Sequence, residues 1–224
     1  MPQIVLVRHG QASFGGADYD VLSELGVRQA ALARAALDAR RVTPTTIVSG
    51  ALRRQLGTAA AWSDVAEPRI DARWNEYDSA DVLHAHGFPD ASLEHPEALT
   101  AGAGADSRRF QEVLDVALAA WIDAGEASPA NESWPAFTGR VRAALDEIAG
   151  GLGSGQTALV ATSGGVIAAV AMLLLDAPPA QFLAFNRVTA NAGLTKVVVG
   201  RSGTTLLSFN EHAHLDAAGA VTYR

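Results

Sequence analysis

The sequence predicts an α/β protein of three layers, α/β/α, in which helices cover both faces of a mostly parallel central sheet. Two observations lead to this prediction. Short apolar runs alternate with segments of helical periodicity, the order expected of parallel strands joined by crossover helices. The first run, Gln3–Val7 (QIVLV), is apolar after its first residue, as strands buried on both faces are. We also expect a helical insertion over the active-site end of the sheet, where the parallel strands finish.

Each element follows from a local pattern. The strands are expected over Gln3–Val7, Thr45–Ser49, Arg69–Asn75 (a short one), Ala158–Thr162, Leu194–Val199 and Thr204–Phe209, and the helices over Ser23–Arg40, Leu52–Ala61, Asp106–Ala124, Ser133–Ile148 and Ser163–Leu175. Ser23 and Ser133 are helix N-cap residues, and Pro178-Pro179 ends the last helix. The turn at Gly200–Gly203 closes a hairpin.

Length and composition exclude several classes of protein. The 224 residues, 49% hydrophobic and 18% charged, fit one domain spanning 1–224, with residues 77–131 as a cap-like insertion. The absence of cysteine excludes disulfides and thiol nucleophiles. A net charge of −7 argues against a nucleic-acid partner, and no apolar run approaches the ~20 residues that span a bilayer. The start of the sequence does not resemble a signal peptide, so we expect a cytoplasmic protein without a membrane partner.

The insertion is the least regular part of the sequence. Tyr77–Gly104 mixes proline, glycine, histidine and acidic residues with little periodicity, and Ala101–Ala105 (AGAGA) reads as a linker of small residues. A polar loop through Gly15-Gly16 follows the first strand. These segments contain no motif that identifies a substrate.

Arg8-His9-Gly10 follows the first strand directly, where a parallel sheet places its active site. A histidine can accept a phosphoryl group when its attacking nitrogen is neutral and the other ring nitrogen is held by an acceptor. Arg8 offers a fork of donors to phosphate oxygens, and Gly10 allows close backbone approach. A polar turn that merely ends the strand is the alternative interpretation.

A second feature lies after the next strand, where a helix begins at once and aims its free N–H groups at the same edge of the sheet. Arg53 and Arg54 stand in the first turn of this helix, where a positive charge opposes the helix dipole. An anionic partner is therefore expected for one of them. That partner is either a bound phosphate or, in the alternative interpretation, an acidic side chain of the protein.

These motifs together resemble the histidine phosphatase superfamily, the group of phosphoglycerate mutases and related acid phosphatases. The family opens with a strand and Arg-His-Gly, and its next motif, Ser-x-x-Leu-x-Arg-x-x-x-Thr-Ala, matches residues 49–59. The alignment selects Arg54 as the phosphate-facing arginine. Glu132-Ser133 resembles the family's Glu-Ser helix start, and the resemblance continues through Gly164-Gly165. It covers nearly the whole chain.

The resemblance implies roles for individual residues. His9 would carry the phosphoryl group, while Arg8 and Arg54 would hold its oxygens. Glu76, in Trp74-Asn75-Glu76, would protonate the leaving oxygen, as a carboxyl kept protonated by burial or nearby negative charge can. Asp78 and Asp81 could share this task, and a surface carboxylate is the alternative interpretation of Glu76.

Ser163 departs from the family pattern. The family usually carries a second histidine in a Ser-His-Gly-Gly setting, whereas this chain reads Thr162-Ser163-Gly164-Gly165. Serine supplies a hydroxyl donor and leaves the helix N-terminus intact, so we expect Ser163 and Gly164 to bind phosphate. Serine brings no charge, and loss of one transition-state donor commonly costs ~10²–10³ in rate. A nucleophilic Ser163 of the ester-hydrolase type is not favoured, because Ala161 leaves that motif incomplete.

Positions after His9 differ as well. The family often has Ser or Thr and then Asn where this chain has Ala12 and Gly15, although Ser13 could replace one contact. These differences disfavour phosphoglycerate mutase activity. Two His-x-His pairs could supply the missing histidine or half of a metal site, but we favour solvated or core roles for them. The pairs are His84 with His86 and His212 with His214.

The sequence thus predicts a metal-independent phosphatase that hydrolyses a small phosphorylated metabolite through a phosphohistidine at His9, without a cofactor. The alternative is a weakly active or non-catalytic protein that binds a phospholigand on the same fold, because of Ser163. The sequence does not indicate the substrate or the oligomeric state.

Overall fold

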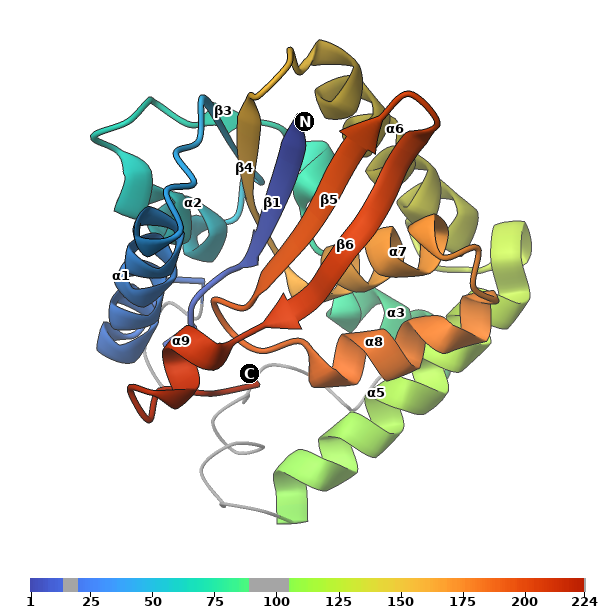
Figure 1. Cartoon of the computed structure of the whole chain (residues 1–224). Helices are drawn as coiled ribbons and strands as arrows, with labels where there is room; N and C mark the ends of the chain where they lie inside the picture. Colours follow the sequence, from blue (N-terminus) through green and yellow to red (C-terminus); the bar gives the residue numbers. More distant parts are fainter. Residues whose placement is uncertain (14–19, 89–104, 224) are drawn as a thin grey trace.

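The computed structural model describes residues 1–13, 20–88 and 105–223 of the chain. Within them, six strands form one sheet in the order β3-β2-β4-β1-β5-β6 (Figure 1). The strands are β1 (Gln3–Arg8), β2 (Thr46–Ser49), β3 (Arg69–Ile70), β4 (Thr157–Thr162), β5 (Leu194–Gly200) and β6 (Gly203–Glu211). The predicted loop at Gly15-Gly16 and linker residues 101–104 lie outside the described residues.

The centre of the sheet is parallel, as predicted. β4 pairs in parallel with β1 on one side and β2 on the other, and β3 pairs in parallel with β2. The hairpin of β5 and β6 joins β1 in the antiparallel sense. Because β1, β2 and β4 run the same way, their carboxyl ends meet at one edge, the lower one in Figure 1. The predicted mixed α/β fold is confirmed.

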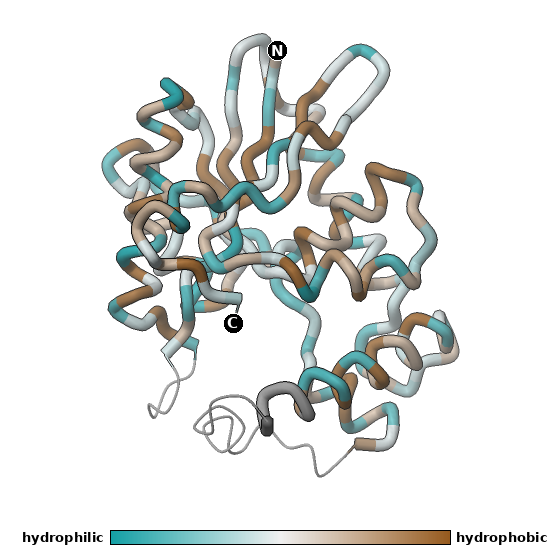
Figure 2. The backbone as a smooth tube through the Cα atoms, turned by 60° about the horizontal axis from the view of Figure 1, so that its bottom comes forward, coloured by the Kyte–Doolittle hydropathy of each residue, from teal (hydrophilic) through white to brown (hydrophobic). Residues whose placement is uncertain are grey.

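Helices cover both faces of the sheet. The longer ones are α1 (Glu24–Ala39), α5 (Ala105–Ala124), α6 (Trp134–Gly151) and α7 (Gly164–Leu174), and the short ones are α2 (Arg53–Ala59), α3 (Ser79–Ala85), α8 (Phe182–Val188) and α9 (Ala213–Asp216). Single 3₁₀ turns stand at Ala60–Trp62, Ala72–Trp74, Gly125–Ala127 and Pro179–Gln181. As predicted, the side chains of Ser23 and Ser133 accept hydrogen bonds from backbone N–H groups in the first turns of α1 and α6. Many helical turns alternate between hydrophobic and hydrophilic residues (Figure 2).

The apolar side chains of the central strands pack into two separate cores. Successive side chains of a strand point to opposite faces, so Val5 and Val7 pack with Leu37 of α1, while Ile4 and Leu6 join the core formed with α5, α6 and α7. All of these side chains are fully buried. Because the middle of β1 fills both cores, its four central residues are all apolar, while the polar Gln3 and Arg8 stand at the partly buried ends.

The predicted insertion contains two described helices, α3 and α5, which contact one another. Figure 1 shows α5 and α8 toward the edge of the sheet where β1 ends. The sequence analysis predicted neither α3 nor α8. Each has seven residues, about two turns, which is too short for a clear apolar periodicity. The predicted strand over Arg69–Asn75 is only two residues long, and a 3₁₀ turn follows it.

A cluster of aromatic rings joins this region to the sheet. Tyr77 lies against Trp121 of α5 and Phe137 of α6, with ring centroids 5.5 and 5.9 Å apart. Phe182, the first residue of α8, lies 4.8 Å from Trp134 and 6.2 Å from Tyr77. Such edge and tilted contacts add to the stability gained from burial. The cluster fixes Tyr77 and therefore the backbone next to Glu76.

None of the helices in the described ranges is long and apolar enough to cross a membrane.

Candidate active site

His9 lies just beyond the paired ends of β1 and β4. The register pairs Arg8 with Thr162, and the His9 backbone N–H donates to the Thr162 carbonyl at 2.8 Å. The next residue, Gly10, packs against the start of α1, where a Cβ would lie 2.2 Å from the Gly26 carbonyl oxygen. Its N–H donates to Thr58 Oγ1 of α2 at 3.0 Å. Only glycine fits here, and the loop that carries His9 is therefore held tightly.

The imidazole of His9 is neutral, with a defined tautomer. Its Nδ1 lies 2.8 Å from the Gly10 carbonyl oxygen, which can only accept, so Nδ1 carries the proton. Its Nε2 lies 3.2 Å from Nε of Arg54, which can only donate, so Nε2 presents its lone pair. Burial lowers the pKa of His9 well below its ordinary value, and the positive charges of Arg8 and Arg54 lower the pKa further. The ring can thus act as a nucleophile through Nε2 once Arg54 Nε turns from this lone pair to a phosphate oxygen.

Arg54 contacts both His9 and an acidic side chain. Its Nη1 donates to Asp20 Oδ1 at 2.6 Å, and the other oxygen of Asp20 accepts from the backbone N–H of Arg53 at 2.7 Å. Asp20 therefore satisfies a free N–H at the start of α2 as well as the guanidinium. The Arg53 side chain is exposed. Sequence analysis singled out Arg54 but did not identify Asp20.

Arg8 is oriented by main-chain carbonyls at the same edge of the sheet. Its Nη1 donates to the carbonyl oxygens of Thr189 and, at 2.9 Å, of Tyr223 in the C-terminal segment. Gly164 lies beside the guanidinium, since a Cβ there would stand 3.4 Å from Arg8 Nε. The structure therefore brings Arg8, the start of α7 and the C-terminal segment together.

Buried amides support the His9 loop from behind. Asn191 donates from Nδ2 to the His9 carbonyl at 3.1 Å. Gln29 of α1 accepts from the Gln11 N–H at 2.8 Å and donates to Thr222 Oγ1, which in turn donates to Asn191 Oδ1 at 2.9 Å. Asn191 and Gln29 are fully buried. The sequence gives no signal for this network, because its members come from distant segments and look like ordinary polar residues.

Glu76 is half-buried, and its carboxyl group lies against the start of α7. Its Oε2 accepts from the Gly165 N–H at 3.0 Å, and its Oε1 accepts from the Tyr77 N–H at 3.3 Å. Burial raises the pKa of Glu76 above its ordinary value, and this effect exceeds the opposing effects of the Gly165 N–H and of the two arginines. The group is thus biased toward the protonated form that a general acid requires.

Asp78 and Asp81 have other partners. Asp78 accepts from the N–H groups of Ala80 and Asp81 and so caps α3. The Asp81 carboxylate accepts from the backbone N–H and the side-chain amide of Asn131, both at 2.7 Å. These contacts favour Glu76 over its two acidic neighbours as the proton donor.

Ser163 is fully buried at the start of α7 and does not cap that helix with its side chain. Its Oγ instead accepts from Gln55 Nε2 of α2 at 2.8 Å. Gln55 stands at a variable position of the motif that carries Arg54, and the sequence analysis did not single it out. The pairing of β1 and β4 ends at Arg8 and Thr162, and the residues that follow directly are His9 and Ser163.

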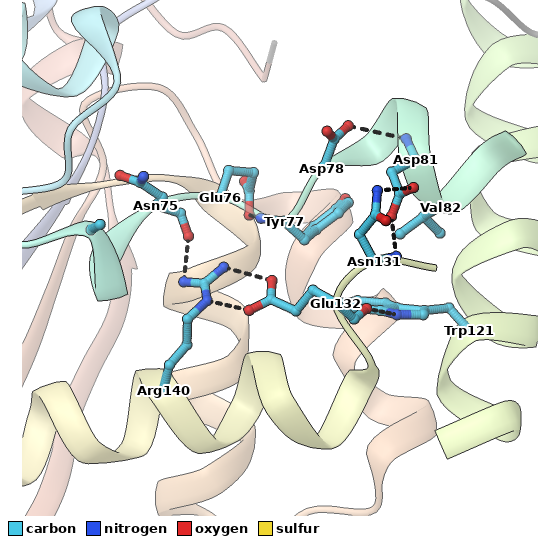
Figure 3. A pocket seen from close by; sticks show the side chains of 11 residues that line it. Asn75, Glu76, Tyr77, Asp78, Asp81, Val82, Trp121, Asn131, Glu132 and Arg140 are labelled. Carbon is cyan, nitrogen blue, oxygen red and sulfur yellow. Dashed lines mark hydrogen bonds and ion pairs between the residues drawn. The ribbon is translucent and has the colours of Figure 1, made fainter. Parts of the chain in front are cut away.

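A hollow of about 250 Å³ borders the other side of the Glu76 segment (Figure 3). Its lining includes Asn75, Asp78, Asn131 and the ion pair of Glu132 with Arg140. The arginine also donates to the Asn75 carbonyl at 2.8 Å and so supports the backbone just before Glu76. The lining includes Glu76 but not His9, Arg8 or Arg54.

The other histidines make contacts elsewhere. His84 is exposed, and His86 Nε2 lies 3.0 Å from Ser128 Oγ. His212 Nδ1 donates to the Asn210 carbonyl oxygen at 2.7 Å, and His214 Nε2 lies 3.1 Å from the Ala192 carbonyl oxygen. Among the described residues, no group of three or more histidine, aspartate or glutamate side chains gathers as a metal ion would need. Ser13 Oγ donates to the Val21 carbonyl.

The fold and the position of these groups define a class: a mostly parallel α/β protein with a polar site at the carboxyl edge of its sheet. The chain belongs to the histidine phosphatase superfamily (branch 1), whose family model matches residues 4–212. No curated protein matches the sequence.

Several solved structures are similar over nearly the whole chain. A mycobacterial glucosyl-3-phosphoglycerate phosphatase is 25% identical, with a TM-score of 0.63 over 93% of this chain and 98% of that chain. An Entamoeba histolytica phosphoserine phosphatase in complex with 3-phosphoglyceric acid is 18% identical, with a TM-score of 0.67 over 96% and 100%. Bacillus stearothermophilus YhfR is 19% identical, with a TM-score of 0.68 over 96% and 100%. The latter two likenesses, at lower identity, support the fold alone.

Proposed function

We propose that the protein is a phosphatase that hydrolyses a phosphate monoester through a phosphohistidine at His9. The observation that carries this proposal is the neutral imidazole of His9. Its Nε2, which carries no proton, lies 3.2 Å from Nε of Arg54. In the first step, Nε2 forms a bond to phosphorus while the bond from phosphorus to the leaving oxygen breaks. Glu76 gives its proton to that oxygen. A water molecule then attacks the phosphorus of the phosphohistidine, and the Glu76 carboxylate takes a proton from that water. The bond from phosphorus to Nε2 breaks, so that phosphate leaves and His9 is neutral again.

Positive charge and N–H groups balance the charge of the phosphoryl group in this proposal. Arg8 and Arg54 bind its oxygens, together with the Ser163 hydroxyl and the backbone N–H of Gly164 at the start of α7. The arginines supply the charge that metal ions supply in many phosphoryl transfers, so the reaction proceeds without a metal. The Asp20 carboxylate lies 2.6 Å from Arg54 Nη1. When phosphate binds, Asp20 therefore either loses this hydrogen bond or remains bound to the guanidinium together with the phosphate.

The proposed substrate is a small phosphorylated metabolite. The similar mycobacterial phosphatase acts on glucosyl-3-phosphoglycerate, and one of its structures holds inorganic phosphate. These likenesses support the substrate class and not a particular compound. We propose that residues 77–131 form a cap-like insertion that selects the compound, within a single domain located in the cytoplasm. A phosphoglycerate mutase is less favoured, because Ala12 stands where the family often has a hydroxyl.

Phosphate release from a panel of phosphorylated metabolites tests the proposal. Wild type is expected to release phosphate and to form an acid-labile phosphohistidine that is trapped by rapid quenching, whereas His9→Ala does neither. Equal background release from both proteins would falsify the phosphatase. His84 is exposed, so His84→Ala serves as the control for the loss of a histidine elsewhere in the protein and is expected to have no effect.

Ser163 motivates a second candidate, a weakly active or non-catalytic protein that binds a phospholigand. This candidate predicts phosphate affinity without a phosphohistidine. Ser163→His restores the family residue, so a gain of turnover in this variant would show that the missing histidine limits the rate. Unchanged turnover together with a wild-type phosphohistidine would leave the phosphatase as the better account.

A further inference from the structure

Gln55 has a fully determined set of hydrogen bonds at the centre of the site. The side chain is completely buried and follows Arg54 on α2. Its Oε1 accepts from the Leu52 N–H at 3.2 Å, and its Nε2 donates to the Trp74 carbonyl at 3.1 Å and to Ser163 Oγ at 2.8 Å. A backbone N–H on one end and a carbonyl on the other fix which atom is nitrogen. The amide therefore cannot flip without losing its bonds.

This orientation decides where the proton of Ser163 goes. A hydroxyl has one hydrogen and two lone pairs, and the Nε2 of Gln55 can only donate to it. One lone pair of Ser163 is thus occupied, and the hydrogen is directed to another acceptor. Ser163 follows Thr162, whose carbonyl accepts from the His9 N–H, so the backbone of Ser163 stands next to the loop that carries His9.

The same amide also connects to the proton donor. The Trp74 carbonyl accepts from Gln55 and, at 2.6 Å, from Thr162 Oγ1. Trp74 precedes Glu76 by two residues and is itself fully buried. Gln55 therefore joins the helix of Arg54, the Ser163 turn and the segment that carries Glu76.

We propose that Gln55 is a positioning residue that keeps the Ser163 hydroxyl a hydrogen-bond donor to the phosphoryl oxygens. In this chain the pair of Gln55 and Ser163 would stand in for the donor that the family's second histidine provides. The effect of Gln55 on catalysis rests on the proposed function, whereas its effect on phosphate binding can be measured with inorganic phosphate alone.

A purely structural role for Gln55 makes a different prediction. The residue reaches back to the Leu52 N–H at the start of α2, and loss of that bond could loosen Arg54 without involving Ser163. In that case the effects of changing Gln55 and Ser163 would add. If Gln55 acts through the hydroxyl, Gln55→Met would weaken phosphate binding in wild type and have little further effect once Ser163→Ala has removed the hydroxyl.

The experiment is a double-mutant cycle on Gln55→Met and Ser163→Ala, with the Kd of inorganic phosphate and the kcat for phosphate release as readouts. A hydrogen bond to a charged group is worth ~1.5–3 kcal/mol, so Ser163→Ala is expected to raise the Kd about tenfold or more. Gln55→Met should cost a similar factor, and the double variant no more than Ser163→Ala. Gln3→Met is the matched control, because the Gln3 amide donates to Thr157 Oγ1 at the opposite end of β4.

Gln55→Glu is a second variant, of nearly unchanged size, that does not depend on Gln55→Met folding. Its carboxylate would accept the Ser163 proton and remove it from phosphate. Once protonated, the carboxyl could donate again. The ratio of the Kd of Gln55→Glu to the Kd of wild type is therefore expected to be larger at pH 8 than at pH 5. A purely structural role predicts the same ratio at both pH values.

Each outcome decides the question. Additive effects in the cycle, or a pH-independent deficit of Gln55→Glu, would overturn the role of Gln55. So would a wild-type protein that does not bind phosphate. If wild type binds phosphate but releases none above the His9→Ala background, the phosphatase fails while the cycle on phosphate binding still tests Gln55.

Discussion

Replacing Gly165 with alanine tests the assignment of Glu76 as the proton donor. A Cβ at this position would lie 2.3 Å from Glu76 Oε1 and 2.5 Å from Tyr77 Cε1, both far inside van der Waals contact. The Tyr77 ring is held between aromatic neighbours, with Trp121 at 5.5 Å. We therefore expect the carboxyl to move and to lose its 3.0 Å bond from the Gly165 N–H. Overpacking of this kind costs about 1–3 kcal/mol in the free energy of unfolding.

The catalytic loss should depend on the leaving group. A positioned acid typically raises the rate ~10²–10⁴-fold. Hydrolysis of an alkyl phosphate depends on the full effect, because an alkoxide is a poor leaving group unless it is protonated. The nitrophenolate of p-nitrophenyl phosphate leaves without a proton, so the loss of kcat for this substrate should be much smaller. Steady-state phosphate release from both substrates measures the difference. Equal losses on the two substrates would refute the role of Glu76.

A matched glycine provides the control. Gly139 of α6 is exposed, and a Cβ there would meet no atom within 4 Å. Gly139→Ala should leave kcat unchanged for both substrates and raise the free energy of unfolding by about 0.5–1 kcal/mol, because alanine favours the helix. Thermal unfolding of both variants separates the stability effect of Gly165→Ala from its effect on proton transfer.

Three further outcomes are expected. The pKa of His9 is lowered below its ordinary 6.5, and the pKa of Glu76 is raised above its ordinary 4.5. Because the reaction needs a neutral His9 and a protonated Glu76, kcat/KM should rise as His9 loses its proton and fall as Glu76 loses its proton. The pH profile of Glu76→Gln should lack the fall. Asp20→Ala removes the acceptor of the Arg53 N–H and should destabilise the protein by about 1 kcal/mol in denaturant unfolding, with Asp20→Asn closer to wild type. Leu145→Ala, in the fully buried core of α6, should cost about 2–5 kcal/mol in the same assay with unchanged KM.

The sequence predicts most of the fold because its elements follow binary patterns. The central residues of β1 and β4 are apolar and prove to be buried on both faces, and α1 and α6 start at serine caps. α8 escapes prediction because it has two turns and is held by one fully buried residue, Phe182, in an aromatic cluster. Its stability comes from tertiary packing, which a local pattern does not contain.

The residues of the candidate site can be predicted from the sequence only where they belong to a recognisable motif. His9, Arg54 and Glu76 stand at motif positions, and the structure places hydrogen-bond partners around each. Gln55 and Asn191 are fully buried amides with functions set by partners far along the chain. A glutamine on a short helix looks solvent-exposed in sequence, and only its burial reveals that all of its hydrogen bonds are made inside the protein.

The contact between Arg8 and the Tyr223 carbonyl has a practical consequence for attachment to this chain. A reporter, tag or tether joined after the C-terminal segment starts next to the guanidinium, where its own charges or carbonyls would compete with a phosphorylated ligand. One joined ahead of Gln3 starts at the opposite end of β1, as the two termini in Figure 1 show. Immobilisation through the amino end should therefore preserve ligand binding, whereas immobilisation through the carboxyl end should weaken it.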